Sequence, residues 1–180
     1  MSEAQLIPLN VSRRRFVFVG LAGAAVLAGA RWLMPSAPTD GSAPAGLTPD
    51  AAGIVRALAP ALLDGALPDD AAERDAAVTR TVAAVGTAIE GLPPASREEL
   101  ATLFALLASM PVRVFVAGLD GAWRDATVAE ANGFLVRLQK SRWSVKRSAY
   151  DALHQLTFAA WYADPKTWPA IGYPGPPALA

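Results

Sequence analysis

Hydrophobic residues beyond position 47 recur mainly at three- and four-residue intervals, the spacing of one face of an α-helix. In the last such stretch, for example, Leu153, Leu156 and Ala160 are in register. Three ranges are predicted to be helical: 48–66, 69–92 and 144–163. Two further helices are predicted to begin at residues 96 and 127. The pattern therefore predicts an all-α fold, a single compact domain of five or six helices without an internal repeat.

Helix starts are marked by side chains that can accept hydrogen bonds from the free N–H groups of a first turn. These signals stand at Thr48, Asp69-Asp70, and the capping boxes Ser96-x-x-Glu99 and Thr127-x-x-Glu130. Pro60 lies inside the first range, where a proline is expected to kink or split the helix. Pro93-Pro94 is expected to end the second helix.

The helix that opens at Ser96 is apolar on nearly all sides, which predicts a place at the centre of the domain. The segment 111–119 is rich in β-branched residues but has no second strand to pair with. It is therefore predicted to be a short helix or an irregular link. The following loop contains Trp123.

The segment 165–180 is rich in proline and glycine, which predicts an extended tail of turns and polyproline II. It nevertheless carries Trp168, Ile171 and Tyr173, and a disordered tail would ordinarily lack such residues. The tail is expected either to pack on its own helices or to dock on another protein. The candidate interface residues are Trp161, Tyr162, Trp168, Ile171, Tyr173, Pro174 and Pro176.

The N-terminal segment combines a pair of arginines with a weakly hydrophobic run. Ser12, Arg13, Arg14 and Phe16 are spaced as in a twin-arginine export signal. The predicted division is a signal peptide at 1–30, a flexible linker at 31–47, a helical domain at 48–164 and a docking tail at 165–180. The twin-arginine route exports proteins that are already folded.

Removal of the signal is left open by the sequence. Ala28-Gly29-Ala30 has the small-x-small form of a cleavage site, with Ala43-Pro44-Ala45 as a later alternative. The 15 uncharged residues from Phe16 to Ala30 are fewer than the roughly 20 that span a bilayer. A retained anchor extended by residues 32–34 is the alternative.

The composition of the chain limits the kinds of functional site that it can form. The chain has 16 Lys plus Arg, 16 Asp plus Glu, one histidine and no cysteine. The absence of cysteine excludes disulfides, thiolate-held clusters, attached c-type haem and cysteine catalysis. Without the predicted signal the chain carries 13 basic and 15 acidic residues, which argues against nucleic-acid binding.

No candidate for a catalytic, cofactor or metal site emerges from the motifs. There is no glycine-rich dinucleotide turn, and the single histidine, His154, is expected to be a structural or interface residue. A basic cluster lies at the predicted junction of the last two long helices, and we expect either a solvated corner or a surface that faces an acidic partner. It consists of Lys140, Arg142, Lys146 and Arg147.

Residues 147–165 (RSAYDALHQLTFAAWYADP), followed by Trp168-x-x-Ile171-Gly172-Tyr173-Pro174-Gly175-Pro176-Pro177, resemble a known family. These are the small subunits of bacterial FAD-dependent dehydrogenases, the gluconate 2-dehydrogenase subunit 3 type, also called gamma or hitch-hiker subunits. The resemblance covers about 145–177 and the export signal, and is only general between them.

The resemblance implies a non-catalytic chain that helps a large flavoprotein of the glucose-methanol-choline (GMC) type to mature and escorts it through twin-arginine export. FAD is then expected in the partner, and the translocase and a cytochrome c subunit are further implied partners. A folded-export signal on a chain without a cofactor motif leads to a similar expectation, because the cargo would be another chain. The alternative is a free-standing or membrane-anchored periplasmic binding or scaffold protein.

Overall fold

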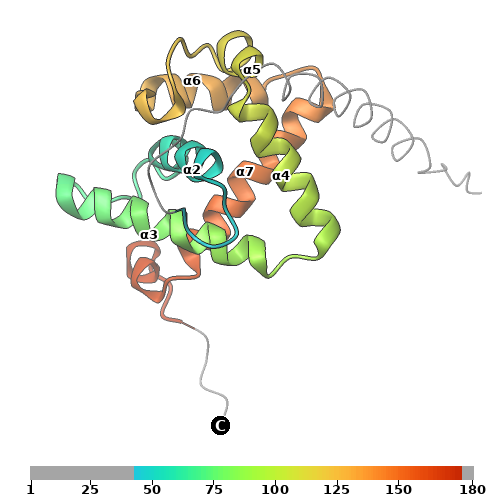
Figure 1. The fold of residues 1–180 in the computed structure, drawn as a ribbon. Helices are drawn as coiled ribbons and strands as arrows, with labels where there is room; N and C mark the ends of the chain where they lie inside the picture. The colour runs from blue at the N-terminus through green and yellow to red at the C-terminus, as the bar shows by residue number, and fades with distance from the viewer. Residues whose placement is uncertain (1–42, 176–180) are drawn as a thin grey trace, which may run out of the picture. The chain divides into compact units, whose positions relative to one another are not determined.

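The computed structural model describes residues 43–175, which form six α-helices and two 3-10 helices with no strand among them (Figure 1). The all-α prediction is confirmed. The α-helices are α2 (Pro49–Leu62), α3 (Ala71–Glu90), α4 (Pro94–Ala108), α5 (Met110–Phe115), α6 (Val128–Gln139) and α7 (Ser144–Tyr162). The 3-10 helices are η1 (Trp123–Asp125) and η2 (Pro165–Ile171).

Helix α2 is the central element of the fold. It packs against α3, α4, α6, α7 and η1, and its Ile54, Leu58 and Ala59 are fully buried. The prediction that the helix after Ser96 lies at the centre is wrong. On that helix, α4, only Phe104 and Leu107 are buried, because its other leucines are spread around the axis and form no single buried stripe.

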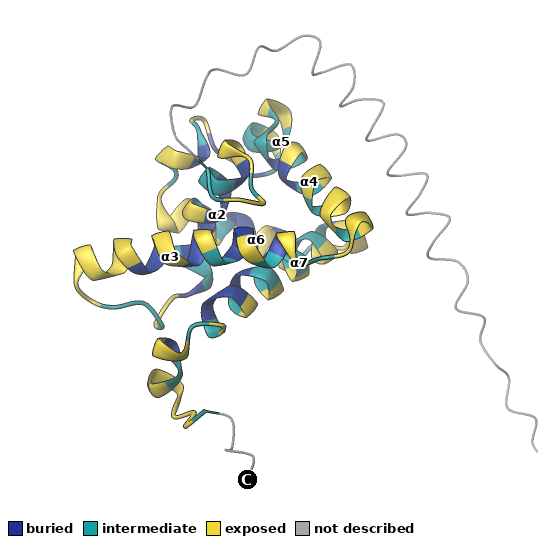
Figure 2. Cartoon of the chain, turned by 60° about the horizontal axis from the view of Figure 1, so that its bottom comes forward, coloured by how far each residue is buried: buried dark blue, intermediate teal, exposed yellow. Residues whose placement is uncertain are grey.

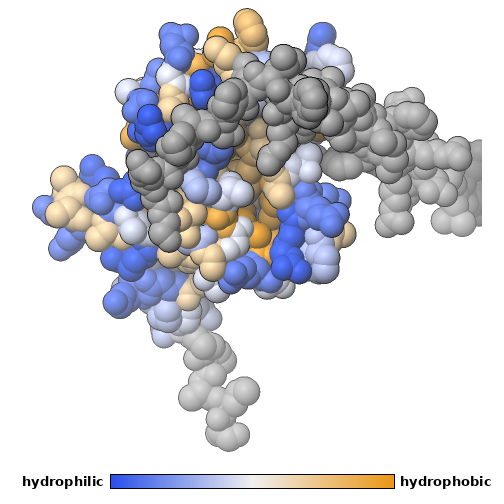
Figure 3. Space-filling model, viewed as in Figure 1, coloured by the Kyte–Doolittle hydropathy of each residue, from blue (hydrophilic) through white to orange (hydrophobic). Residues whose placement is uncertain are grey.

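Burial follows one side of each long helix in Figure 2, where the outer turns of α3 and α4 are exposed. Leu103 of α4 and Leu156 of α7 are half-buried and pack against the core from its edge. Hydrophobic surface is visible near the centre of the face seen in Figure 3, between hydrophilic margins. Some apolar side chains of the helices therefore remain partly exposed at the surface.

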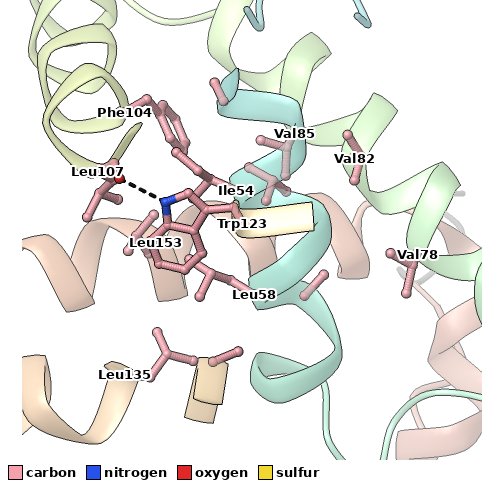
Figure 4. Close-up of a cluster of buried hydrophobic side chains, with 14 of the residues drawn as sticks. Ile54, Leu58, Val78, Val82, Val85, Phe104, Leu107, Trp123, Leu135 and Leu153 are labelled. Atoms are coloured by element: carbon pink, nitrogen blue, oxygen red, sulfur yellow. Dashed lines mark hydrogen bonds between the residues drawn. The ribbon is translucent and has the colours of Figure 1, made fainter. Parts of the chain in front are cut away.

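Trp123 closes the core from the side of the α5–α6 connection (Figure 4). Its ring meets Phe134 edge-on, with 5.3 Å between ring centroids. Its indole N–H donates to the carbonyl oxygen of Leu107 at 2.8 Å, so the one polar atom of the side chain is satisfied. Through these contacts the short η1 ties α4 and α6 to the buried face of α2.

Three of the four predicted helix starts are capped as expected. The side chains of Thr48, Asp70 and Thr127 accept from the backbone N–H groups of Ala51, Glu73 and Glu130. The Ser96 capping box is wrong, because α4 already begins at Pro94. Proline suits a first helical position since its φ is preset and its missing N–H would have no partner there.

Pro60 neither splits α2 nor ends it at once, because the helix continues to Leu62. It still stops four residues before the predicted end, and the chain turns at Gly65 with φ +76°. The proline lies in the last turn, so only Ala61 and Leu62 of the helix follow the backbone hydrogen bond that it removes. That position explains why the expected break is absent.

Residues 43–47, assigned from the sequence to the flexible linker, lie against α3. A Cβ at Gly46 would overlap the carbonyl oxygen of Gly86, and a Cβ at Gly86 would overlap that of Ala45. Leu47 packs against the core. Two glycines thus permit a backbone-to-backbone approach that larger residues would prevent. The rest of the predicted linker, 31–42, lies outside the described residues.

The Thr127–Glu130 capping box provides a test of helix capping in this fold. The hydroxyl and the backbone N–H of Thr127 both donate to the Glu130 carboxylate, at 2.7 and 2.8 Å, which lowers the pKa of Glu130. We expect Thr127→Ala to lower the free energy of unfolding by about 1 kcal/mol at neutral pH. Urea unfolding of the variant and the wild type measures this difference.

The pH dependence of that difference has a definite sign. A carboxyl with a lowered native pKa stabilises the fold above its unfolded pKa, and this contribution is lost as pH falls through the native pKa. The gap between Thr127→Ala and wild type should therefore narrow in acid. Thr87→Ala is the control, because the Thr87 hydroxyl only donates back to Ala83 within its helix. An equal loss in both variants would rule out the cap as the cause.

Candidate functional site

Four aromatic side chains follow one side of α7 at four-residue steps, and we call them the aromatic ladder: Tyr150, His154, Phe158 and Tyr162. Successive ring centroids are 5.6, 4.2 and 6.0 Å apart, and the His154 and Phe158 rings are stacked. All four residues are half-buried. Residues spaced by four are neighbours on a helix, so the ladder is a continuous strip at the protein surface.

Beyond α7 the chain forms the 3-10 helix η2, and the predicted run of turn and polyproline II is wrong for residues 165–171. Asp164 caps this helix by accepting from the N–H of Lys166 at 3.0 Å, and Pro165 occupies its first turn. The same pairing of a capping side chain and a proline starts α2 at Thr48-Pro49. That shared signal was available in the sequence.

Trp168 joins the folded tail to the end of the ladder. Its indole N–H donates to the carbonyl oxygen of Tyr162 at 2.8 Å, and its ring meets Tyr173 edge-on at 5.2 Å. Gly172 adopts φ +71° and lets the chain turn back, so that the N–H of Tyr173 donates to the carbonyl of Trp168. The tail therefore packs partly on its own domain, one of the two arrangements expected for it.

The predicted interface residues divide into two groups. Trp161 is only 9% exposed and belongs to the hydrophobic core, while Tyr162 and Trp168 are half-buried. Ile171 and Tyr173 are 56% and 45% exposed, and Pro174 is exposed beside them. Of the predicted interface residues, Trp161 is thus closed to a partner, while Ile171, Tyr173 and Pro174 lie on the outer face of the tail.

Pro176 and the export-signal and cleavage residues of the N-terminal segment lie outside the described residues. Those N-terminal residues are Ser12, Arg13, Arg14, Phe16, Ala28 and Ala30.

A groove of about 570 Å³ lies between the α2–α3 connection, α3 and the start of the tail. Its wall is built largely of small apolar side chains from 66–84 and 160–170, with Arg80 and Lys166 among its charged residues. The hydroxyls of Thr81 and Thr167 are buried and lie within hydrogen-bonding distance of backbone carbonyls. Both hydroxyls are therefore already engaged within the chain.

His154 lies beside a smaller pocket of about 130 Å³ between α2, α6 and α7. Its polar neighbours there are Asn132, Gln139 and Tyr150, and Gln139 donates to the Tyr150 hydroxyl at 3.3 Å. Neither a serine nor a carboxylate lines this pocket, so its lining does not complete a Ser-His-Asp triad with the histidine. Stacking on Phe158 is the main contact that the structure gives His154.

Within residues 43–175, no group of three histidine, aspartate or glutamate side chains is arranged to hold a metal ion. In the same range, no helix has both the length and the apolar character needed to cross a membrane.

Sequence reasoning missed the aromatic ladder, although its signal was the repeat of aromatic residues at 150, 154, 158 and 162. It also missed that Met110 and Phe115 are exposed on α5. Comparisons with protein-family models, with curated proteins and with solved structures found no match to this chain.

Proposed function

We propose that this chain is the small, non-catalytic subunit of a periplasmic FAD-dependent dehydrogenase of the GMC type, acting on an alcohol or a sugar. It escorts the flavin-bearing subunit through twin-arginine export and stabilises or matures it. FAD is held by the partner, and electrons pass from it to a separate cytochrome or quinone. No residue of this chain is assigned a catalytic role.

The observation that carries the proposal is the segment 147–175, where the family resemblance coincides with a folded, partly exposed aromatic surface. The tail continues from the end of the ladder and is joined to it by the Trp168–Tyr162 hydrogen bond. Ile171 and Tyr173 remain exposed on a backbone that is already ordered. A preorganised aromatic surface loses little conformational entropy on binding, and aromatic residues dominate the energetics of protein interfaces.

The N-terminal arginine pair supports the same proposal. A twin-arginine signal is useful to a protein that must fold before export, typically because it carries a cofactor. The motifs of this chain contain no dinucleotide-binding turn. Export of a cofactor-loaded partner together with this chain would explain why the chain carries such a signal.

The test is to coexpress the flavoprotein with this chain carrying Arg13→Lys and Arg14→Lys. We expect dehydrogenase activity to fall strongly in the periplasmic fraction and to remain in the cytoplasm, because the translocase reads the arginine pair itself. Arg15→Lys is the matched control, since it keeps the charge and leaves the pair intact.

Normal periplasmic activity with the double variant would contradict the escort role. Purification separates the proposal from its alternative. A stoichiometric yellow complex supports the subunit assignment, whereas a lone colourless chain supports a free-standing binding or scaffold protein.

A further inference from the structure

The corner between α6 and α7 concentrates positive charge. Residues 131–150 contain five Lys or Arg and no Asp or Glu, and Asp151, one turn along α7 from Arg147, is the next acid in the sequence. Arg137 is engaged elsewhere, because it donates to the carbonyl of Ala117 at 2.6 Å. The other four, Lys140, Arg142, Lys146 and Arg147, lie within eight residues. The two ion pairs found among the described residues involve none of them.

Two large apolar side chains project from the same corner. Trp143 is 60% exposed and Val145 is 46% exposed. The Arg142 guanidinium lies over the Trp143 ring, 5.7 Å from its centroid. Arg147 donates to the carbonyl of Ser141 at 2.7 Å, and the Ser141 hydroxyl oxygen accepts from the N–H of Trp143. The turn is therefore held in a conformation that presents the tryptophan outward.

We propose that this corner, formed by Lys140, Arg142, Trp143, Val145, Lys146 and Arg147, binds an anionic lipid surface. Clustered basic residues are attracted to anionic headgroups, and tryptophan favours the boundary between headgroups and acyl chains. The stems of lysine and arginine can lie along apolar surface while their charges remain in water. The corner supplies all three elements in one short, ordered segment.

A lipid surface fits this corner better than an acidic protein does. A specific protein interface buries about 800 Å² on each partner around an apolar core. The corner has only two exposed large apolar side chains, and neither observed pocket is lined by its residues. A bilayer accepts single side chains without a matching pocket.

The corner lies at the opposite end of α7 from the folded tail, a separation of about 28 Å along the 19-residue helix (Figure 1). Lipid binding at one end thus leaves the folded tail free at the other, and the ladder runs between the two from Tyr150 to Tyr162. The inference does not depend on the proposed function, since it uses only the charges and exposure of this corner.

The absence of cysteine allows a position-specific test on the full-length chain. A polarity-sensitive fluorophore is attached to Ser144→Cys at the corner, or to Ala95→Cys in the exposed first turn of α4 as the matched control. Each protein is mixed with vesicles of phosphatidylcholine alone or with added phosphatidylglycerol. Because the N-terminal signal can also bind vesicles, the readout is the environment of each label and not total binding.

We expect a blue shift at position 144 with the anionic vesicles only, lost at high salt, and no shift at position 95. Adding Lys140→Gln and Arg142→Gln should weaken the vesicle affinity reported by the 144 label about 25-fold, roughly fivefold per charge. Arg80→Gln with Arg97→Gln removes the same net charge elsewhere and should leave it unchanged. Equal shifts at both labels, or no shift at either, would overturn the proposal. So would a 144 label that responds only to the copurified flavoprotein.

Discussion

Replacing Trp123 by alanine is expected to lower the free energy of unfolding by about 3–5 kcal/mol, the usual range for truncating a buried tryptophan. The side chain is buried between α2, α4 and α6, contacts Phe134 edge-on, and donates its N–H to Leu107. Removing it leaves a cavity beside α2 and an unpaired carbonyl on α4. A denaturant-unfolding series on the full-length chain measures the loss.

Two variants identify the source of that loss. Trp123→Phe keeps an aromatic ring but removes the donor, so a smaller cost of about 1–3 kcal/mol is expected from the unpaired Leu107 carbonyl. Trp143→Ala removes a tryptophan that is mostly exposed and should change stability by no more than about 0.5 kcal/mol. If Trp123→Ala were no more destabilising than Trp143→Ala, the packing of η1 described above would be wrong.

A second large effect is expected at the tail, on the premise of the proposed function. Ile171→Ser combined with Tyr173→Ala should weaken the complex with the flavoprotein by about 2–4 kcal/mol, the scale of interface hot spots. Both residues are exposed in the isolated chain, so their removal should lower its free energy of unfolding by no more than about 0.5–1.5 kcal/mol, the contribution of the Trp168–Tyr173 ring contact. Titration calorimetry with the purified partner measures the complex, and thermal unfolding measures the isolated chain.

Trp168→Ala provides the contrasting variant. Trp168 is half-buried and bonded to Tyr162, so its loss should destabilise the isolated chain as well as the complex. If the Ile171–Tyr173 double variant instead left the complex unchanged and destabilised the chain, the tail would serve only its own domain.

Part of the candidate site could be predicted from local sequence. The proline, glycine and aromatic residues of the tail were enough to single out 165–175. The conformation of the tail was missed, although Asp164-Pro165 carries the same helix-start signal as Thr48-Pro49. The distinction between Trp161 and Tyr162 was also available, because Trp161 continues the buried register of Leu153 and Thr157 at four-residue steps. Tyr162 is about 100° further round the helix and belongs to the ladder.

What the sequence by itself determined about this protein is local: the all-α class and the caps at Thr48, Asp70 and Thr127. These depend on residues within one or two turns of each other, whose spacing and hydrogen-bonding capacity are visible in the chain. Only the tertiary structure decided that α2 is central and α4 lies at the edge, that Trp123 reaches Leu107, and that Trp168 closes on Tyr162. Those outcomes depend on which apolar surfaces meet, and that choice is made by packing between segments far apart in the sequence.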